Sequence, residues 1–336
     1  MSGIINKTWG DYKLYSLVNN KGTQVDISDL GAIIVNFFVK NSDGHSKNIV
    51  LGYDEPQGYL NGQCFFSCVV GPWANRIEQG AYTLDGQTIQ LEQNEGTNHL
   101  HGASANVGAK RWQVAAAKNN VLELTTSTKA GEAGYPHHID FKVVYELTDN
   151  DELKIGYFAT PAGKTPINMT QHAYFNLDES QDILDHSLQI NSEDYLFVDS
   201  AAIPVTTESV AGTPMDFRTE KKISQDINAD FSQLTNAGGF DHCWCFTSTN
   251  MKKVATLFAP NRELSLEVHT DQIGMQFYSG NFIVNEAGRN NTTYRKNAGL
   301  CLETQNYPNK INMDNNQNCI FDDTNPYRHF VTYKVV

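Results

Sequence analysis

Side chains that could carry acid–base chemistry gather in five short segments of this 336-residue sequence. The segments are GPWANRIEQG, NEGTNHLHGA, TPINMTQHAYFNL, GGFDHCW and GLCLETQNYP. They contain the candidate residues Asn75, Arg76, His99, His101, His172, Asp241, His242 and Glu303. Histidine and carboxylate groups are the side chains that most often move protons to and from a substrate. The residue types therefore favour general acid–base catalysis.

Metal binding is the main alternative use of these histidines. His99 and His101 are two residues apart, so both could lie on one face of a strand, and His172 and Glu303 are conceivable further ligands. A catalytic zinc site usually takes three protein ligands. However, neither H-E-x-x-H nor a short His-x-Asp/Glu-x-His cluster is present. We therefore predict an activity that needs neither a metal nor another cofactor.

Nucleophilic and phosphate-binding chemistries lack their sequence motifs. There is no G-x-S-x-G elbow, and no cysteine has a basic partner nearby in the sequence. The phosphate cradles GxGxxG and GxxxxGK[ST] are also absent. Acid–base chemistry on a neutral substrate remains, and hydroxyl groups of a sugar would suit the Arg, Asn, Asp and Gln side chains nearby.

Charge and hydropathy argue against several classes of partner. The chain has 38 acidic and 25 basic residues, which gives a net charge of −13 and disfavours nucleic acid. No stretch approaches the roughly 20 apolar residues of a membrane helix. The N-terminus MSGIINKTWG lacks a basic start followed by an apolar run, so we expect no secretory signal and a cytoplasmic location.

The six cysteines are predicted to be reduced and structural. Most lie in apolar runs such as QCFFSCVV, HCWCF and GLCLE, and none forms a C-x-x-C pair. In a reducing compartment such cysteines act as small hydrophobic side chains.

The elements that must position the site residues are predicted to be strands. Short alternating runs recur at GAIIVNFFV, WQVAAA, VLELTTST, FKVVYEL, LKIGYFAT, VATLF, LSLEV and HFVTYKVV. AYTLDGQTIQL predicts a hairpin, because Asp85-Gly86 supplies the two positive φ angles of a tight turn. DEPQGYL and the stretch from Lys221 to Asp226 are the only short helix candidates. We predict one all-β domain over residues 1–336, most simply stacked antiparallel sheets, with a closed barrel as the alternative.

Five motifs, in order along nearly the whole chain, resemble those of the aldose 1-epimerase (galactose mutarotase) family. GPWANRIEQGAYTLDGQTIQLEQNEGTNHLHGA is similar to the family's ANRI segment, hairpin and N-x-LHG motif. NMTQHAYFNL resembles its second histidine motif, FDHCW its DH motif, IGMQFYSGNF its QFYTGNF strand and CLETQNYPNKIN its glutamate motif. GPW before ANRI, LHGA for LHGG, and Gln171 before the second histidine depart from the usual pattern. These departures flank the motif residues without replacing them.

The resemblance implies a large antiparallel β-sandwich of the galactose mutarotase-like type, called a supersandwich, with an open sugar cleft. It implies interconversion of the α and β anomers of free hexoses such as galactose and glucose. Glu303 would be the general base and His172 the general acid. The other residues would hold or polarise the sugar, with His101 also assisting catalysis: Asn75, Arg76, His101, Asp241 and Gln276.

Three other functions remain open from the sequence. One is a hexose-6-phosphate 1-epimerase, for which Lys110 and Arg111 would be the candidate phosphate contacts. The second is a carbohydrate-binding protein of the same fold without catalysis, and the third is a metal-dependent enzyme with a cupin-like barrel. The preferred sugar, the pathway and the choice between monomer and homodimer are not determined by the sequence.

Overall fold

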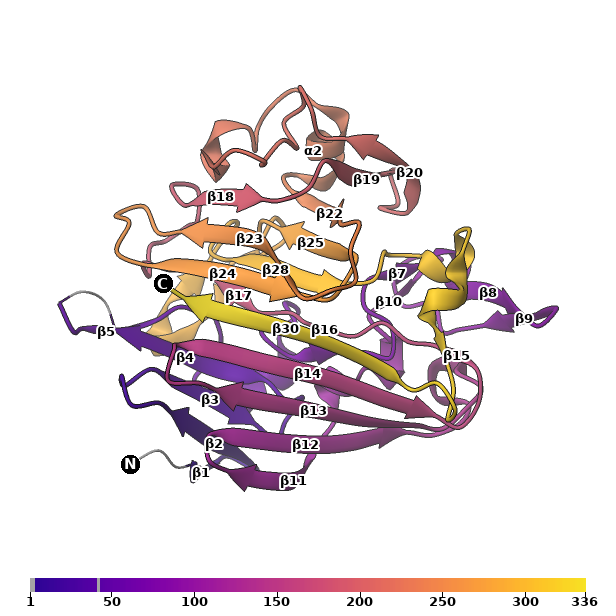
Figure 1. Cartoon of the computed structure of the whole chain (residues 1–336), viewed down its shortest axis with the longest axis horizontal. Coiled ribbons are helices and arrows are strands. Elements are labelled where there is room, and N and C mark those ends of the chain that lie inside the picture. Colours follow the sequence, from indigo (N-terminus) through magenta and orange to yellow (C-terminus); the bar gives the residue numbers. More distant parts are fainter. Residues whose placement is uncertain (1–3, 41–42) are drawn as a thin grey trace.

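A nine-stranded antiparallel sheet is the largest element of the computed structural model, which describes residues 4–40 and 43–336. It runs from β11 at the bottom of Figure 1 to β18 near the top, with the short β21 beyond it. In spatial order its strands are β11 (Gln113–Lys118), β12 (Val121–Thr128), β13 (Ile139–Leu147), β14 (Glu152–Pro161), β30 (Tyr327–Val335), β24 (Ser265–Thr270), β23 (Lys252–Phe258), β18 (Ser187–Ile190) and β21 (Lys221–Lys222).

Two further sheets pack against this large sheet and form the core with it. The five-stranded sheet consists of β1 (Ile5–Trp9), β2 (Tyr12–Val18), β3 (Gln24–Ser28), β4 (Ile34–Lys40) and β5 (Ser46–Asn48). The six-stranded sheet consists, in spatial order, of β17 (Tyr174–Phe175), β28 (Leu300–Gln305), β25 (Gly274–Tyr278), β22 (Asp241–Cys245), β19 (Asp194–Val198) and β20 (Pro204–Ser209). The central strands of the six-stranded sheet carry Asp241, Gln276 and Glu303.

Short ribbons and helices complete the described chain. The two-stranded ribbons are β6 (Val69–Val70) with β16 (Thr170–Gln171), β7 (Arg76–Ile77) with β10 (His99–Leu100), β8 (Ala81–Leu84) with β9 (Gln87–Gln90), β15 (Thr165–Pro166) with β29 (Ile320–Phe321), and β26 (Glu286–Ala287) with β27 (Thr293–Tyr294). The α-helices are α1 (Pro56–Asn61) and α2 (Ser232–Ala237). The 3₁₀ turns are η1 (Glu78–Gly80), η2 (Ala103–Ala105), η3 (Val107–Ala109), η4 (Glu132–Gly134), η5 (Ile223–Gln225), η6 (Arg289–Asn291), η7 (Lys310–Asn312) and η8 (Asn316–Cys319).

The sheets pack face to face, as aromatic side chains of the large sheet show. Tyr333 of β30 packs against Phe175 of β17, with ring centroids 5.0 Å apart, and its hydroxyl donates to the Leu302 carbonyl at 3.3 Å. Tyr145 of β13 donates to the carbonyl of Ala32, beside the five-stranded sheet, at 2.6 Å. One cluster of buried hydrophobic side chains includes residues from all three sheets. The described sheets have free edges, so the fold is the predicted sandwich and not a closed barrel.

Most sequence-based element predictions are confirmed. The eight predicted runs are β4, β11, β12, β13, β14, β23, β24 and β30. Asp85 and Gly86 have φ of 50° and 78°, so the β8–β9 hairpin has the predicted turn. The prediction of a helix from Lys221 to Asp226 is wrong in part, since this stretch is β21 followed by the single turn η5. Lys221 is extended because it pairs with Leu188 of β18, and its ammonium group donates to the Pro214 carbonyl and to Asp226 in partly buried contacts.

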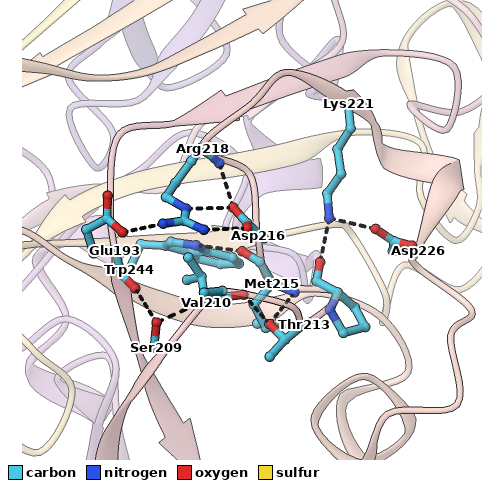
Figure 2. Close-up of polar contacts among 12 residues, drawn as sticks. Glu193, Ser209, Val210, Thr213, Met215, Asp216, Arg218, Lys221, Asp226 and Trp244 are labelled. Atoms are coloured by element: carbon cyan, nitrogen blue, oxygen red, sulfur yellow. Dashed lines mark hydrogen bonds and ion pairs between the residues drawn. The ribbon is translucent and has the colours of Figure 1, made fainter.

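The segment that leads to α2 is tied to the sheet by a polar network (Figure 2). Arg218 forms ion pairs with Asp216 and Glu193. The indole of Trp244 in β22 donates to the Met215 carbonyl at 3.2 Å. These contacts fix the start of the loop against the strand that carries Asp241. No helix in residues 4–40 and 43–336 combines the length and apolar composition that crossing a lipid bilayer requires.

Candidate active site

Glu303 and His172 face each other at the centre of the site. Glu303 lies in the middle of β28, and His172 follows β16, 131 residues earlier in the chain, directly before β17, which pairs with β28. His172 Nε2 lies 3.7 Å from Glu303 Oε1, and both side chains are almost fully buried. This distance is too long for a direct hydrogen bond. The second carboxylate oxygen of Glu303, Oε2, has no hydrogen-bond partner.

Burial shifts both pKa values away from their ordinary range. Loss of hydration raises the pKa of Glu303 well above normal, and the negative charge of Asp241 raises it further. Loss of hydration lowers the pKa of His172 to about 4. A carboxylate with a raised pKa is a stronger base, and an imidazolium with a lowered pKa is a stronger acid. Both shifts favour the neutral forms, in which Glu303 holds a proton and His172 does not, so the roles that the motifs imply require this proton to pass to His172 first.

His101 lies next to His172 in a loop with positive φ angles that hydrogen bonds to Asn75 hold in place. His101 and Asn75 have φ of 53° and 65°, a left-handed conformation that is uncommon outside glycine. The two residues fix each other, because the Asn75 N–H donates to His101 Nδ1 at 3.1 Å and the His101 N–H donates to the Asn75 carbonyl at 3.2 Å. Since Nδ1 accepts, the imidazole proton of neutral His101 lies on Nε2. Its ring centroid lies 5.4 Å from that of His172.

Arg76 and Asp241 line an open cavity of about 420 Å³. Arg76 forms a bidentate ion pair with Glu95, with both N···O distances 2.6 Å. Gln276 Nε2 donates to Asp241 Oδ1 at 2.7 Å, and Gln276 lies opposite Glu303 in the β25–β28 register. Burial raises the pKa of Asp241, while the charge of Arg76 and the Gln276 hydrogen bond oppose the increase.

The structure thus brings all seven predicted site residues into one region. The His101, His172 and Glu303 side chains are buried and do not line the cavity, whereas Arg76 and Asp241 do. Asn75 and Gln276 support His101 and Asp241 through the hydrogen bonds above.

His99 and His242 have structural surroundings. His99 contacts the Glu92 carbonyl at 2.7 Å and the Tyr135 hydroxyl at 2.9 Å, and its side chain is fully buried. His242 points away from the site, because side chains alternate along β22 and its neighbour Asp241 lines the cavity. Because both ring nitrogens of His99 have these partners, His99 does not join the metal ligands that the sequence analysis considered.

Three residues that the sequence analysis did not select border the site. Glu95 binds Arg76, and Phe65, with 39% of its surface exposed, lies with its ring centroid 5.2 Å from that of His101 and 5.9 Å from that of His172. Cys301 Sγ lies 3.4 Å from His172 Nδ1. Cys301 and Glu303 are two residues apart in the apolar run GLCLE, and this spacing was the available signal for a shared face of a strand. Among the described residues, His172, Cys301 and Glu303 form the group able to hold a metal ion.

Comparison with known proteins matches this chain to one family over nearly its full length. The sequence profile described as "Aldose 1-epimerase" matches residues 13–334. The chain is 36% identical to the aldose 1-epimerase of Escherichia coli K12 over 305 residues, which cover 90% of this chain and 88% of that protein. It is 36% identical to the galactose mutarotase of Bos taurus over 316 residues, which cover 93% of this chain and 90% of that protein.

Solved structures share the fold. A crystal structure of galactose 1-epimerase from Lactobacillus acidophilus has a TM-score of 0.86 at 26% identity and covers 100% of this chain and 98% of its own. An aldose epimerase homologue from C. elegans has a TM-score of 0.88 at 22% identity, covering 100% and 99%, and supports the fold alone. On the family profile and the curated relatives together, this chain belongs to the aldose 1-epimerase family.

Proposed function

We propose that Glu303 and His172 carry the aldose 1-epimerase activity of this isomerase on free hexoses such as galactose and glucose. The observation that carries the proposal is the buried carboxylate–imidazole pair, 3.7 Å apart, with an unpartnered carboxylate oxygen. A protein interior normally satisfies buried polar groups, so an unpaired carboxylate oxygen close to the cavity residue Asp241 supports a site for a ligand.

The reaction requires two proton transfers at the anomeric centre. Glu303 takes the proton of the C1 hydroxyl while His172 gives a proton to the ring oxygen, and the ring opens to an aldehyde. Rotation about C1–C2 presents the other face of the aldehyde. Reclosure returns each proton to its donor, so the enzyme is unchanged and no cofactor is consumed. Each positioned proton transfer is worth about 10²–10⁴-fold in rate.

The pair works when it holds a single proton. Burial disfavours the charged forms of both groups, so in the free enzyme this proton lies on Glu303, and its transfer to His172 leaves the net charge of the pair unchanged. Glu303 as carboxylate and His172 as imidazolium is the arrangement that starts ring opening. The Nε2–H of His101 can stabilise negative charge that develops on the sugar oxygens.

The binding residues offer donors and acceptors to the sugar hydroxyls. Arg76, already oriented by Glu95, presents its remaining N–H groups, and Asp241 presents its second oxygen. A charged group hydrogen-bonded to a neutral hydroxyl contributes about 1.5–3 kcal/mol. Asn75 and Gln276 hold the neighbouring polar groups in place.

The charges around the cavity favour a neutral sugar over a hexose phosphate. The charged residues that line it are Arg76, Glu95, Asp199 and Asp241. Lys110 pairs with Glu132, and Arg111 pairs with Asp29 and lines a different cavity. Both candidate phosphate contacts are therefore occupied elsewhere, and the cavity has one cation against three acidic side chains.

Polarimetry with freshly dissolved α-D-galactose and α-D-glucose tests the proposal. The expected result is a rate of mutarotation proportional to enzyme concentration and absent from Glu303→Gln. Binding of the sugar without any rate would support the non-catalytic carbohydrate-binding function instead. A higher kcat/KM for glucose 6-phosphate than for glucose, measured side by side at low salt, would support the hexose-phosphate epimerase.

The wider context of the protein is also proposed here. We infer that residues 1–336 act as one domain, which the buried cluster shared by the three sheets supports. A monomer or homodimer is expected, and sedimentation analysis distinguishes the two. The six unpaired cysteines support a reducing, cytoplasmic location, which cell fractionation tests.

A further inference from the structure

The His172 ring is contacted at both of its edges, and the two edges have different partners. Nε2 lies 3.7 Å from Glu303 Oε1, whereas Nδ1 lies 3.4 Å from Cys301 Sγ. Tyr174 stacks on the face of the ring, with centroids 5.1 Å apart and planes inclined by 26°. All four side chains are buried. The ring is therefore oriented with one nitrogen toward the carboxyl group and the other toward the sulfur.

The position of the single N–H of neutral His172 decides whether Glu303 can give it a proton. Because burial raises the pKa of Glu303 and lowers that of His172, the shared proton lies on Glu303 in the free enzyme. Ring opening of the sugar needs this proton on Nε2, so Nε2 must offer a lone pair and the N–H must lie on Nδ1. A buried Nδ1–H in turn needs an acceptor, since an unpaired donor destabilises the protein.

The thiol of Cys301 is placed to be this acceptor. Its Sγ faces Nδ1, and a thiol sulfur can accept a hydrogen bond as well as donate one. Burial and the negative charge of Glu303 raise the pKa of Cys301 well above its ordinary value, so the group stays an uncharged thiol. If the S–H donated to Nδ1 instead, Nε2 would carry the ring proton and could not accept from Glu303.

We propose that Cys301 is a positioning residue, which accepts a hydrogen bond from His172 Nδ1–H and so keeps Nε2 free to receive the proton of Glu303. This role deepens the proposed function and rests on it. The proton passes from the Glu303 carboxyl group to the Nε2 lone pair, and the Nδ1–H···S bond persists in the imidazolium. Cys301 itself neither gives nor takes a proton.

A neutral sulfur acceptor also keeps His172 a strong acid. His329, on the core side of β28, donates Nδ1–H to the carboxylate of Asp271 at 2.7 Å. A carboxylate partner stabilises an imidazolium by its charge, whereas a thiol is only a weak acceptor. Burial lowers the pKa of His172 to about 4, and a contact with its own backbone opposes part of this decrease. Cys301 thus orients the ring without removing the acidity that protonation of the sugar ring oxygen requires.

Nitrogen NMR of the full-length protein with isotope-labelled histidine tests the tautomer directly. Protonated and unprotonated ring nitrogens differ in chemical shift, and their couplings to the carbon-bound ring protons distinguish Nδ1 from Nε2. The His172 signals are identified as those lost from His172→Asn. At neutral pH without sugar, wild type should carry the ring proton on Nδ1. In Cys301→Ala the share of the Nε2–H form should rise, because the Nδ1–H has lost its sulfur acceptor.

Polarimetry over a range of sugar concentrations tests the effect on turnover. Cys301→Ala should lower kcat about 3–10-fold, the range expected when one weak hydrogen bond is lost. Its KM should stay near wild type, because the contacts to the sugar hydroxyls remain. Cys301→Ser retains an acceptor, so its kcat should exceed that of Cys301→Ala. Cys319→Ala is the matched control and should keep the wild-type kcat, since Cys319 is also buried but donates to the Asn316 carbonyl in a separate hydrophobic cluster.

A wild-type ring proton on Nε2 would overturn the inference, and so would an unchanged kcat in Cys301→Ala. If Cys301→Ala does not fold, the tautomer of wild type decides the matter alone. Failure of the proposed function gives a different pattern, in which His172 carries its proton on Nδ1 but the protein lacks mutarotation activity.

Discussion

A histidine–carboxylate pair lies on each face of strand β28. The two pairs differ in how many hydrogen bonds their carboxylates accept. On the cavity side, Glu303 and His172 are 3.7 Å apart and Glu303 Oε2 has no partner. On the core side, the neighbouring Thr304 contacts His329 Nε2 at 3.1 Å, and His329 Nδ1 donates to Asp271 Oδ1 at 2.7 Å. The Phe330 N–H also donates to Asp271, at 3.0 Å.

The pKa directions of the two carboxylates follow from this difference. Burial without a partner raises the pKa of Glu303. Burial acts in the same direction on Asp271, but the hydrogen bond and charge of His329 outweigh it and lower the pKa of Asp271. A satisfied pair stabilises the fold, whereas an unsatisfied pair holds reactive groups ready at a cost in stability. The two pairs should therefore respond in opposite ways to substitution.

Removing a proton carrier from the cavity-side pair should have the largest effect. Glu303→Gln and His172→Asn should each lower kcat by at least about 100-fold, because one acid–base group is lost. The thermal midpoint of Glu303→Gln should equal or exceed that of wild type, since a neutral amide replaces a group whose charged form is poorly solvated. Polarimetry and circular dichroism measure the two quantities. More than about a tenth of the wild-type kcat in both variants would contradict the assignment.

Substitution in the core-side pair should act on stability alone. Asp271→Asn should lower the free energy of unfolding by about 1.5–3 kcal/mol, the usual contribution of a hydrogen bond to a charged group. Its kcat per folded molecule should stay near wild type. Asp140→Asn is a matched control, because Asp140 also contacts a histidine, His138, at 3.0 Å, but on the surface with 71% of the side chain exposed. Urea unfolding measures both variants. An equal loss of unfolding free energy in Asp140→Asn and Asp271→Asn would refute the comparison.

Asp241 is an intermediate case, with one oxygen bonded to Gln276 and the other available to the sugar. Asp241→Asn should lower kcat/KM about tenfold, because a charge-assisted hydrogen bond of about 1.5 kcal/mol is lost. Most of the change should be in KM. Initial rates over a range of glucose concentrations measure this split, and an unchanged KM with a kcat loss like that of Glu303→Gln would make Asp241 a proton carrier.

His242 extends the comparison to a buried histidine without a carboxylate. Burial lowers its pKa to about 3, against about 6.5 in the unfolded chain. Between these values the unfolded state binds the proton, so the contribution to stability is complete above pH 6.5 and is lost as the pH falls toward 3. His242→Asn, which can still accept the Asp241 N–H, should therefore show a smaller fall in thermal midpoint between pH 7 and pH 4.5. The exposed His138→Asn should follow the wild-type curve.

Chelation should have the smallest effect. Because Glu303 and His172 supply both proton transfers, EDTA treatment should not lower the mutarotation rate. Dialysis against EDTA followed by polarimetry measures this. Loss of activity that zinc or iron restores would show that the cavity-side pair works through a metal.

The sequence predicted the β elements well because their signals are local. Alternating apolar residues define β12 and β13, and Asp85-Gly86 defines one hairpin turn. It predicted neither α2 nor the extended conformation of Lys221, which depends on pairing with Leu188 of β18. Short elements of this kind are decided by tertiary contacts more than by propensity.

The residue types of the site were readable from the sequence, since the motifs contain histidine, carboxylate and guanidinium groups whatever their arrangement. Only the tertiary structure decided that His172 meets Glu303, that Arg76 pairs with Glu95, and that Cys301 lies at the other edge of the His172 ring. Only it decided the pKa directions, because these depend on burial. The physical reason is that strand periodicity is a property of neighbouring residues, whereas distance across a sheet and loss of hydration are properties of the packed chain.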